Sequence, residues 1–506
     1  MNDRIPIVIG VTGHRNIPAE YTAALYEKAR AFLDGLRRRY PHTEIIVLSA
    51  LAIGADTICA RAALDSGCTL IAPLPMGKKA YRTDFLAGDE AVFERLCGAA
   101  KYCFAVTSET AAAPRSSYYR ESGKYIKEHS HLLLALWDGD GREVRDGGTS
   151  DIVRMAARGD PAEQAVPLRE SEKIPVFHIV TPKAGKPLPD EPLSAFFIPA
   201  GGAAQPCDTF PAVGFFEDAE QFNTDVIANK ALIRGGAKAS LAACLNGETL
   251  PGPPERFGDL PGVFAAADVL ANICRRKRNG AVRNLSLIAL FLVFFFLVYA
   301  EASVYLSLAL YALLLIPAFL IHRGSKKGKW HERYMLYRTL AETLRVQLYL
   351  RIAGDENRVR IAEWRRERAL DFVQGAVLPF LIPPFHAEGG PEIAERCWVE
   401  GQLRYHLRSK QGKGRSHLTH ESAARFLMFA AIVFCAAALF YEGLFPREME
   451  EVLANLSFIP ISPAAMLTLS DLFKLALGLL FAGAAFLSNY YGKLSLPEQI
   501  ANDEKM

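Results

Sequence analysis

The sequence of 506 residues has nine cysteines but no Cys-x-x-Cys pair. Its closely spaced histidines, His129 with His131 and His417 with His420, have no thiol nearby, so the spacing of a zinc site is missing. The number of cysteines is odd, and most of them lie within apolar runs. This pattern is typical of reduced structural thiols in a cytoplasmic protein, and we expect neither a disulfide framework nor a bound metal.

The chain also has little excess of charge of either sign, because its 58 Lys and Arg residues nearly balance its 55 Asp and Glu residues and leave a net charge of +3. This balance excludes a globally basic nucleic-acid binder, and we expect no nucleic-acid partner. The hydrophobic share of 50% and the mean hydropathy of +0.10 are high for a soluble protein with 22% charged residues. The length predicts three or four domains. No signal peptide is expected, because the apolar run 5–11 is too short.

The first 181 residues alternate between short apolar runs and helical patterns. This alternation predicts an α/β domain with a doubly wound, mostly parallel sheet, in which ligands bind beyond the carboxyl ends of the strands. The expected strands are 6–12, 44–49, 69–73, 102–107, 132–137 and 175–180, and the expected helices are 19–39, 55–66, 81–99, 116–129 and 149–158.

Glycine and polar residues gather where three of these strands end. The first strand ends in Gly-Val-Thr-Gly-His-Arg (10–15), the second in Ser-Ala-Leu-Ala-Ile-Gly-Ala-Asp (49–56), and the fifth leads through Trp-Asp-Gly (137–139) to Gly-Gly-Thr (147–149). Glycines let backbone approach a ligand, Arg15 can pair with phosphate, and helix N-termini attract anions. Each motif alone is also compatible with a tight turn or a helix cap.

Together these strings, with Tyr-x-x-Asp-Phe at 81–85, resemble the SLOG superfamily of Rossmannoid domains, which includes DprA/Smf-like and LOG-like members that bind nucleotides or nucleotide-derived ligands. The resemblance covers about residues 5–181. It implies a nucleotide-derived ligand and no further cofactor. The candidate binding residues are Gly13, His14, Arg15, Ser49, Gly54, Asp56, Asp138, Gly147, Gly148 and Thr149.

The chain departs from the LOG-type phosphoribohydrolases at one position. Their Pro-Gly-Gly-x-Gly-Thr-x-x-Glu motif carries a catalytic glutamate, whereas Ile152 stands at that place here and no proline precedes Gly147. Asp151 is one residue earlier, but a helix turns about 100° per residue, so its side chain would point elsewhere. We therefore predict no catalytic residues and favour binding over hydrolysis.

Four apolar stretches are long enough to cross a membrane. The first two form a hairpin at 285–321, and the others are 426–441 and 472–490. Clusters of Lys and Arg flank the stretches on one side only, which predicts that both termini are cytoplasmic. No charge lies deep within a stretch, which argues against a transporter. We expect a multi-pass protein of the bacterial inner membrane, with the lipid bilayer as a partner.

We expect four parts: a ligand-binding domain at 1–181, a Pro/Gly-rich linker and helical extension at 182–261, a helical region at 262–425, and the second hairpin with a short tail at 426–506. The hairpin followed by Tyr-Arg-Thr-Leu-Ala-Glu-x-Leu-Arg (337–345) is similar to SLATT membrane modules of bacterial conflict systems. That similarity implies an effector that perturbs or permeabilises a membrane when a nucleotide signal arrives, in anti-phage defence. We also expect a homo-oligomer, because several subunits acting together would add their small coupling energies. The alternative is a membrane-anchored hydrolase of LOG type.

Overall fold

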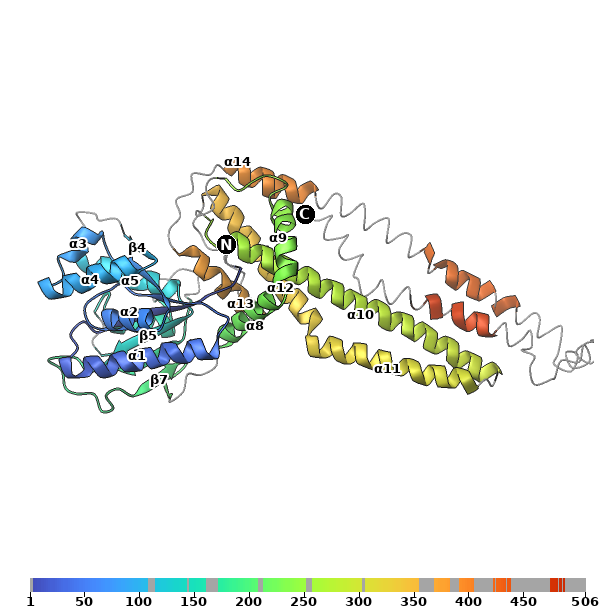
Figure 1. Ribbon diagram of the computed structural model, residues 1–506, viewed down its shortest axis with the longest axis horizontal. Helices are drawn as coiled ribbons and strands as arrows, with labels where there is room; N and C mark the ends of the chain where they lie inside the picture. Colours follow the sequence, from blue (N-terminus) through green and yellow to red (C-terminus); the bar gives the residue numbers. More distant parts are fainter. Residues whose placement is uncertain are drawn as a thin grey trace, which may run out of the picture. The chain divides into compact units, whose positions relative to one another are not determined.

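The computed structural model describes residues 3–107, 114–142, 145–160, 172–207, 213–251, 257–302, 305–354, 368–382 and 391–404, with short helical pieces between 422 and 486. Two compact units make up the chain (Figure 1). The first unit comprises Met1–Leu270 and Leu336–Ala394, and the second comprises Ala271–Met335 and Glu395–Met506. The long helices α10 (Leu260–Ala302) and α12 (Trp330–Ala353) therefore each contribute to both units.

The first unit contains an eight-stranded sheet with the order β4-β3-β2-β1-β5-β6-β7-β8. Strands β1 to β6 are parallel, so the expected doubly wound, mostly parallel sheet is confirmed. The strands are β1 Ile7–Gly13, β2 Ile45–Leu48, β3 Thr69–Leu74, β4 Tyr102–Ala105, β5 Leu132–Trp137, β6 Val176–Val180, β7 Ala195–Ile198 and β8 Gln205–Pro206.

Strands β7 and β8 continue the sheet antiparallel within a segment that we expected to be a linker. The register pairs Phe177 with Phe197 and His178 with Phe196. These strands have four and two residues and are only half-buried or exposed, so their apolar pattern is too short to stand out in a Pro/Gly-rich stretch.

Helices cover both faces of the sheet. They are α1 Ala19–Arg39, α2 Ala55–Asp65, α3 Lys78–Arg82, α4 Ala87–Ala99, α5 Arg115–Glu128 and α6 Thr149–Arg158. The single helix expected at 81–99 is divided into α3 and α4. Between them Asp84 accepts hydrogen bonds from Arg115 and Tyr119 of α5, so tertiary contacts hold the chain out of a continuous helix.

The two faces follow the alternation of side chains along each strand. Ile9 and Leu134 point to the face covered by α1 and α2, where Leu33 is completely buried. Val8 and Leu133 point to the opposite face, where the side chains of α5 and α6 pack. The apolar residues of α1 recur every three to four positions, at Leu25, Ala29, Phe32, Leu33 and Leu36, which is why this helix buries one stripe.

Residues beyond the sheet complete the first unit. They include α8 Gly214–Ala228, α9 Lys230–Cys244 and α13 Arg368–Val377. Asn223 of α8 bonds both backbone groups of Ile5, accepting its N–H and donating to its carbonyl oxygen, each at 2.9 Å. His131 accepts the N–H of Val8 at Nδ1, and its Nε2 donates to the carbonyl oxygen of Gly375. Short helical turns follow at Leu378–Leu381 and Pro391–Ala394, and in the second unit at Glu395–Glu400.

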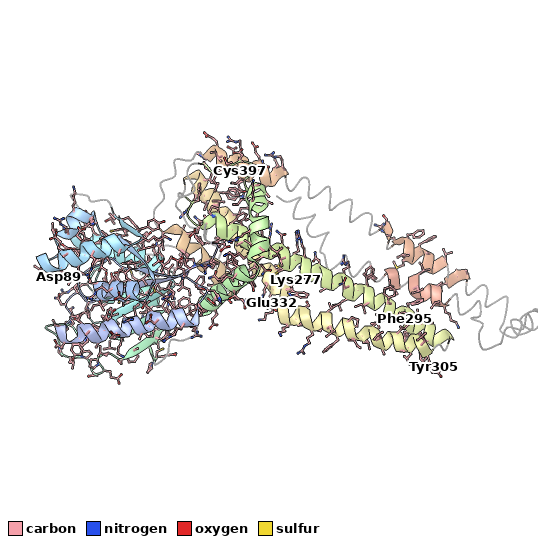
Figure 2. The ribbon with its side chains drawn as sticks, viewed as in Figure 1. Asp89, Lys277, Phe295, Tyr305, Glu332 and Cys397 are labelled. Atoms are coloured by element: carbon pink, nitrogen blue, oxygen red, sulfur yellow. The ribbon has the colours of Figure 1, made fainter. Side chains whose placement is uncertain are left out.

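Three long helices lie between α9 and α13 in the chain: α10 Leu260–Ala302, α11 Tyr305–Gly328 and α12 Trp330–Ala353. One face of α12 is buried, at Tyr337, Leu340, Leu344 and Leu348. Among the described residues, two helical stretches are long and apolar enough to cross a membrane, and their most apolar 18-residue segments have mean hydropathies of 2.3 and 2.0. In Figure 2, Phe295 and Tyr305 lie at one end of the hairpin, and Lys277 and Glu332 lie at the other.

The other two expected membrane spans, 426–441 and 472–490, lie largely outside the described residues. In and beside them, the structure describes apolar helix at Arg425–Ala437 and Lys474–Ala484, with gaps. The part of the chain that the structure describes therefore provides two candidate spans, by length and composition, and the other two of the four predicted spans stay a prediction.

Candidate ligand-binding site

A cavity of about 350 Å³ opens at the carboxyl ends of β1 and β5. Its volume is within the usual range for small-molecule sites. The strand order places β2, β3 and β4 on one side of β1 and β5 on the other, so the cavity lies at the point where the winding reverses. Open α/β sheets bind ligands at this point, because the loops that leave neighbouring strands diverge there.

Eight of the ten predicted site residues line this cavity: Gly13, His14, Arg15, Asp56, Asp138, Gly147, Gly148 and Thr149. Ser49 is instead completely buried behind the wall, where its hydroxyl donates to the carbonyl oxygen of Asp56 and accepts the N–H of Leu51. Gly54 also lies behind the wall. A Cβ there would lie 2.4 Å from the carbonyl oxygen of Arg15, and φ is +88°, so only glycine fits. Both residues shape the turn that presents Asp56.

His14 and Asp138 join the ends of β1 and β5. Nε2 of His14 accepts the backbone N–H of Asp138 at 3.0 Å, so the proton of the neutral ring is on Nδ1. The carboxylate of Asp138 lies 3.2 Å from the same nitrogen. Burial lowers the pKa of His14, Asp138 opposes this shift, and Lys183 adds to it. The ring is therefore neutral at physiological pH and acts as a fixed hydrogen-bonding wall.

The start of α2 is not an open anion site, contrary to our expectation for this helix. The N–H of Ala55 donates to the carbonyl oxygen of His14, and the N–H of Thr57 donates to the carbonyl oxygen of Ala52. The N–H of Ala52 donates to Oδ2 of Asp56 at 3.4 Å, so the chain places its own carboxyl group at this helix end. Burial raises the pKa of Asp56 to about 7, against the opposing effects of the Ala52 N–H and Arg15. Asp56 can therefore be either protonated or ionised near neutral pH.

The Gly-Gly-Thr loop before α6 is held by α5. A Cβ on Gly147 would lie 2.8 Å from the backbone nitrogen of Arg120, and φ is +70°, so the close approach requires glycine. The guanidinium of Arg120 contacts Asp146 at 2.8 Å and Asp151 at 3.5 Å. These contacts fix the loop that carries Thr149 and Arg145 to the cavity.

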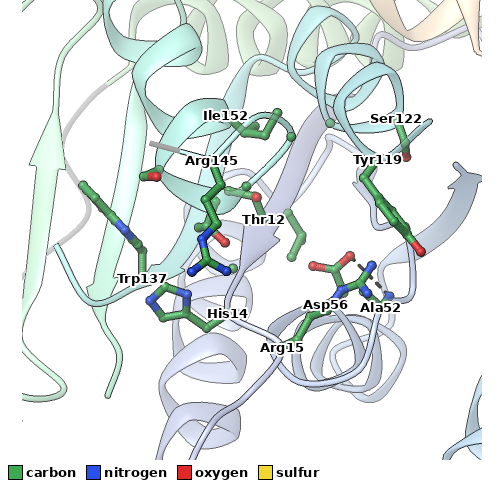
Figure 3. A pocket seen from close by; sticks show the side chains of 18 of the residues that line it. Thr12, His14, Arg15, Ala52, Asp56, Tyr119, Ser122, Trp137, Arg145 and Ile152 are labelled. Carbon is green, nitrogen blue, oxygen red and sulfur yellow. Dashed lines mark hydrogen bonds between the residues drawn. The ribbon is translucent and has the colours of Figure 1, made fainter. Parts of the chain in front are cut away.

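Several other residues line the cavity. Arg145, Lys183, Lys186 and Tyr119 were not predicted from the sequence, and Trp137 belonged to a predicted motif but was not among the candidate binding residues. The guanidinium of Arg15 lies 4.5 Å from the ring centre of Tyr119, a cation–π contact. Figure 3 shows Arg145, His14 and Trp137 on one side of the cavity, and Arg15, Asp56 and Tyr119 on the other.

Two of the missed residues had a signal in the sequence. Lys183 and Lys186 follow β6, so the rule that the carboxyl ends of strands meet at one edge would have included them. Tyr119 had none, since it reaches the cavity from the middle of α5.

Cations outnumber carboxyl groups around the cavity. The four cations are Arg15, Arg145, Lys183 and Lys186, and the three carboxyl groups are Asp56, Asp138 and Asp140. Asp140 is already engaged, with Arg142 at 2.9 Å and Lys186 at 3.8 Å, and the Arg142 contact lowers its pKa to about 2. The remaining positive charge suits an anionic ligand with flat groups that can stack on an aromatic ring.

The position of the LOG-type glutamate is apolar in the structure as well. Ile152 lines the cavity, whereas Asp151 is buried beside it and pairs with Arg154 at 2.8 Å and with Arg120. Asp151 also accepts the N–H of Gly147, so its role is to hold the loop. Among the described residues, no group of three His, Cys, Asp or Glu side chains is arranged to hold a metal ion.

No family model and no curated protein matches the chain. Among solved structures, the chain is similar to "X-ray structure of DNA processing protein A (DprA) from Streptococcus pneumoniae", with 18% sequence identity and a TM-score of 0.20. The match covers 29% of this chain and 45% of that one, so the chain spans less than half the length of that protein. The α/β fold of this chain is established by the order and register of its own strands.

Proposed function

We propose that the protein is a membrane effector controlled by a nucleotide-derived signal, which binds in the cavity between β1 and β5. The cavity carries this proposal, because it combines four cationic side chains with aromatic rings at the switch point of the sheet. Arg145 and the two lysines suit a phosphate group, while Tyr119 and Trp137 suit a base. The resemblance to the SLOG superfamily supports the same class of ligand. Ile152 in the cavity wall supports binding without hydrolysis.

The long helices support the proposed output at a membrane. Helix α10 begins among buried residues of the first unit and continues without a break into the second. Helix α12 begins in the second unit and continues without a break to buried residues of the first. The apolar hairpin carries its cations at the end where Lys277 lies, which favours cytoplasmic termini in a multi-pass inner-membrane protein (Figure 2). The similarity to SLATT modules supports a role in anti-phage conflict.

The coupling energy available per site supports an oligomer. A ligand can shift a conformational equilibrium only by its difference in affinity for the two states. A tenfold preference corresponds to about 1.4 kcal/mol per site. Several subunits that switch together would add such contributions, so we propose that the active form is a homo-oligomer.

The second candidate is a membrane-anchored nucleoside-phosphate hydrolase of LOG type. One observation favours it: Asp56 is a cavity carboxyl group whose pKa of about 7 suits a general acid or base. The catalytic position of that family, however, is occupied by Ile152.

Adenosine 5′-monophosphate (AMP) tests both candidates in one experiment. Calorimetry with the full chain in detergent should detect AMP binding, and chromatography should recover the nucleotide intact after incubation. Removal of a charge-assisted contact costs about 1.5–3 kcal/mol, so Arg145→Gln should weaken binding about tenfold or more. Arg38→Gln is the matched control, because Arg38 is exposed near the end of α1 and does not line the cavity, and it should bind as the parent does. Repeated release of adenine would instead establish the hydrolase. Failure of AMP, ADP and NAD to bind at millimolar concentration would contradict the nucleotide site.

A cellular experiment tests the effector role. Expression of the parent chain together with production of the signal should dissipate the membrane potential, measured with a voltage-sensitive dye. Arg15→Ala should abolish this effect while membrane fractions retain the same amount of protein. Equal depolarisation by Arg15→Ala and the parent would show that the cavity does not control the membrane region.

A further inference from the structure

Two cysteines on neighbouring elements bring their sulfur atoms into contact at the edge of the sheet. Cys97 lies in the last turn of α4, and Cys103 lies in β4, the edge strand. Their Sγ atoms are 3.3 Å apart. A disulfide bond has a length of about 2.05 Å, so a small adjustment at the end of α4 would bring the two atoms to bonding distance.

The two thiols differ in access and in acidity. Cys103 is exposed, whereas Cys97 is 6% exposed. The contact with Cys97 lowers the pKa of Cys103, and the ammonium of Lys78 adds to this effect against the cost of burial. The same contact raises the pKa of Cys97, with burial as the second cause. The accessible sulfur is thus the one that more readily becomes a thiolate, which is the reactive form of cysteine.

We propose that Cys97 and Cys103 form an oxidation site that takes a hydroperoxide as co-substrate and closes to an intramolecular disulfide. The Cys103 thiolate attacks the hydroperoxide, an S–O bond forms, and the O–O bond breaks. The alkoxide or hydroxide that leaves takes up a proton, and Cys103 becomes a sulfenic acid. Cys97 then loses its proton and attacks the sulfur of Cys103, forming the S–S bond and releasing water. Two thiols lose two electrons, and one hydroperoxide is reduced to water and an alcohol, or to two waters.

This site is distinct from two other thiols of the sheet domain, Cys59 and Cys68. Cys59 is completely buried and Cys68 is 7% exposed. Burial raises the pKa of Cys59, and it raises that of Cys68 to about 11. These two thiols therefore provide internal controls that should stay reduced under the same conditions.

Peptide mapping of the full-length protein tests the proposal. Trypsin cuts after Arg95, Lys101 and Arg115, so Cys97 and Cys103 fall in separate peptides, 96–101 and 102–115. After treatment with hydrogen peroxide and blocking of free thiols with N-ethylmaleimide, mass spectrometry should show these two peptides joined, at 2 Da less than their sum. Dithiothreitol should separate them. The peptides with Cys59 and Cys68 should carry the maleimide once the protein is denatured.

Two variants establish the order of the steps. Cys103→Ser should prevent oxidation of Cys97 at the same peroxide concentration. Cys97→Ser should leave Cys103 as a sulfenic acid, which dimedone traps. The proposal is wrong if the parent protein shows no joined peptides while Cys103 either stays reduced or accumulates as the dimedone adduct. Circular dichroism of both variants checks that the serine replacements keep the fold.

Discussion

The ring of His14, at the end of β1, accepts the backbone N–H of Asp138, at the end of β5, over 3.0 Å. These residues are 124 positions apart in the sequence, yet their strands are neighbours in the sheet, paired from Ile9 with Leu132 to Gly13 with Leu136. The contact fixes the distance between the two strand ends that bound the cavity. The geometry of the candidate site therefore depends on the order of strands as much as on the local motifs.

Gly147→Ala should destabilise the loop before α6. The new Cβ would lie 2.8 Å from the backbone nitrogen of Arg120, and its φ of +70° is unfavourable for alanine. We expect a loss of about 1–3 kcal/mol, seen as a lower melting temperature and weaker AMP binding. Gly141→Ala is the control, since a Cβ there meets nothing within 4 Å. Equal melting temperatures for the two variants would contradict the tight packing of Gly147 on α5.

The stability of the first unit should depend on pH through Asp56. Burial raises the pKa of this carboxyl group from 3.8 to about 7, so the folded state binds its proton more tightly than the unfolded state. Its contribution to stability is complete below about pH 4 and is lost as the pH rises through 7, to an upper limit of about 4 kcal/mol. In Asp56→Asn this dependence should disappear.

Melting curves of the full chain at pH 5 and pH 8 measure this effect. The parent should lose more stability than Asp56→Asn between the two values. Asp190→Asn serves as the control, because Asp190 is exposed in the loop before β7 and should leave the parental difference unchanged. An identical change with pH in Asp56→Asn and the parent would show that this carboxyl group is already ionised at pH 5.

Asn223→Ala should loosen the attachment of α8 to the sheet. The side chain of Asn223 is completely buried and bonds the N–H and the carbonyl oxygen of Ile5 as well as the hydroxyl of Thr43. Its removal leaves buried backbone groups without partners, at a cost of about 1–3 kcal/mol. Gln221→Ala on the exposed side of the same helix should have little effect. Faster amide exchange at Ile5 in Asn223→Ala alone, measured by mass spectrometry, would identify the cause.

The topology of the hairpin can be measured by cysteine labelling in the full chain. Tyr305→Cys, at the tip between α10 and α11, should react with a membrane-impermeant maleimide applied to spheroplasts. Lys277→Cys, at the opposite end, should react only after the membrane is permeabilised. The parent chain gives the background from its native cysteines. Labelling of Lys277→Cys before permeabilisation would reverse the proposed orientation.

Much of the fold could be predicted because its signals are local. The six parallel strands and the helices on both faces follow from apolar periodicity, which depends only on neighbours along the chain. Where the prediction failed, the deciding contacts are distant in sequence. Asp84 is held by α5 and divides one expected helix into two, and the short strand β7 exists because β6 offers it an edge to pair with.

The candidate site, too, could be predicted from the sequence only in part. By itself the sequence determined which glycines and polar residues follow each strand, and eight of those ten residues line the cavity. Only the tertiary structure decided that Ser49 and Gly54 support the wall from behind, and that Asp56 occupies the end of α2 in place of an outside anion. It also brought Tyr119 under Arg15 and placed Cys97 against Cys103. The physical reason is that a strand end is specified locally, whereas the neighbours of a side chain depend on how separate elements pack.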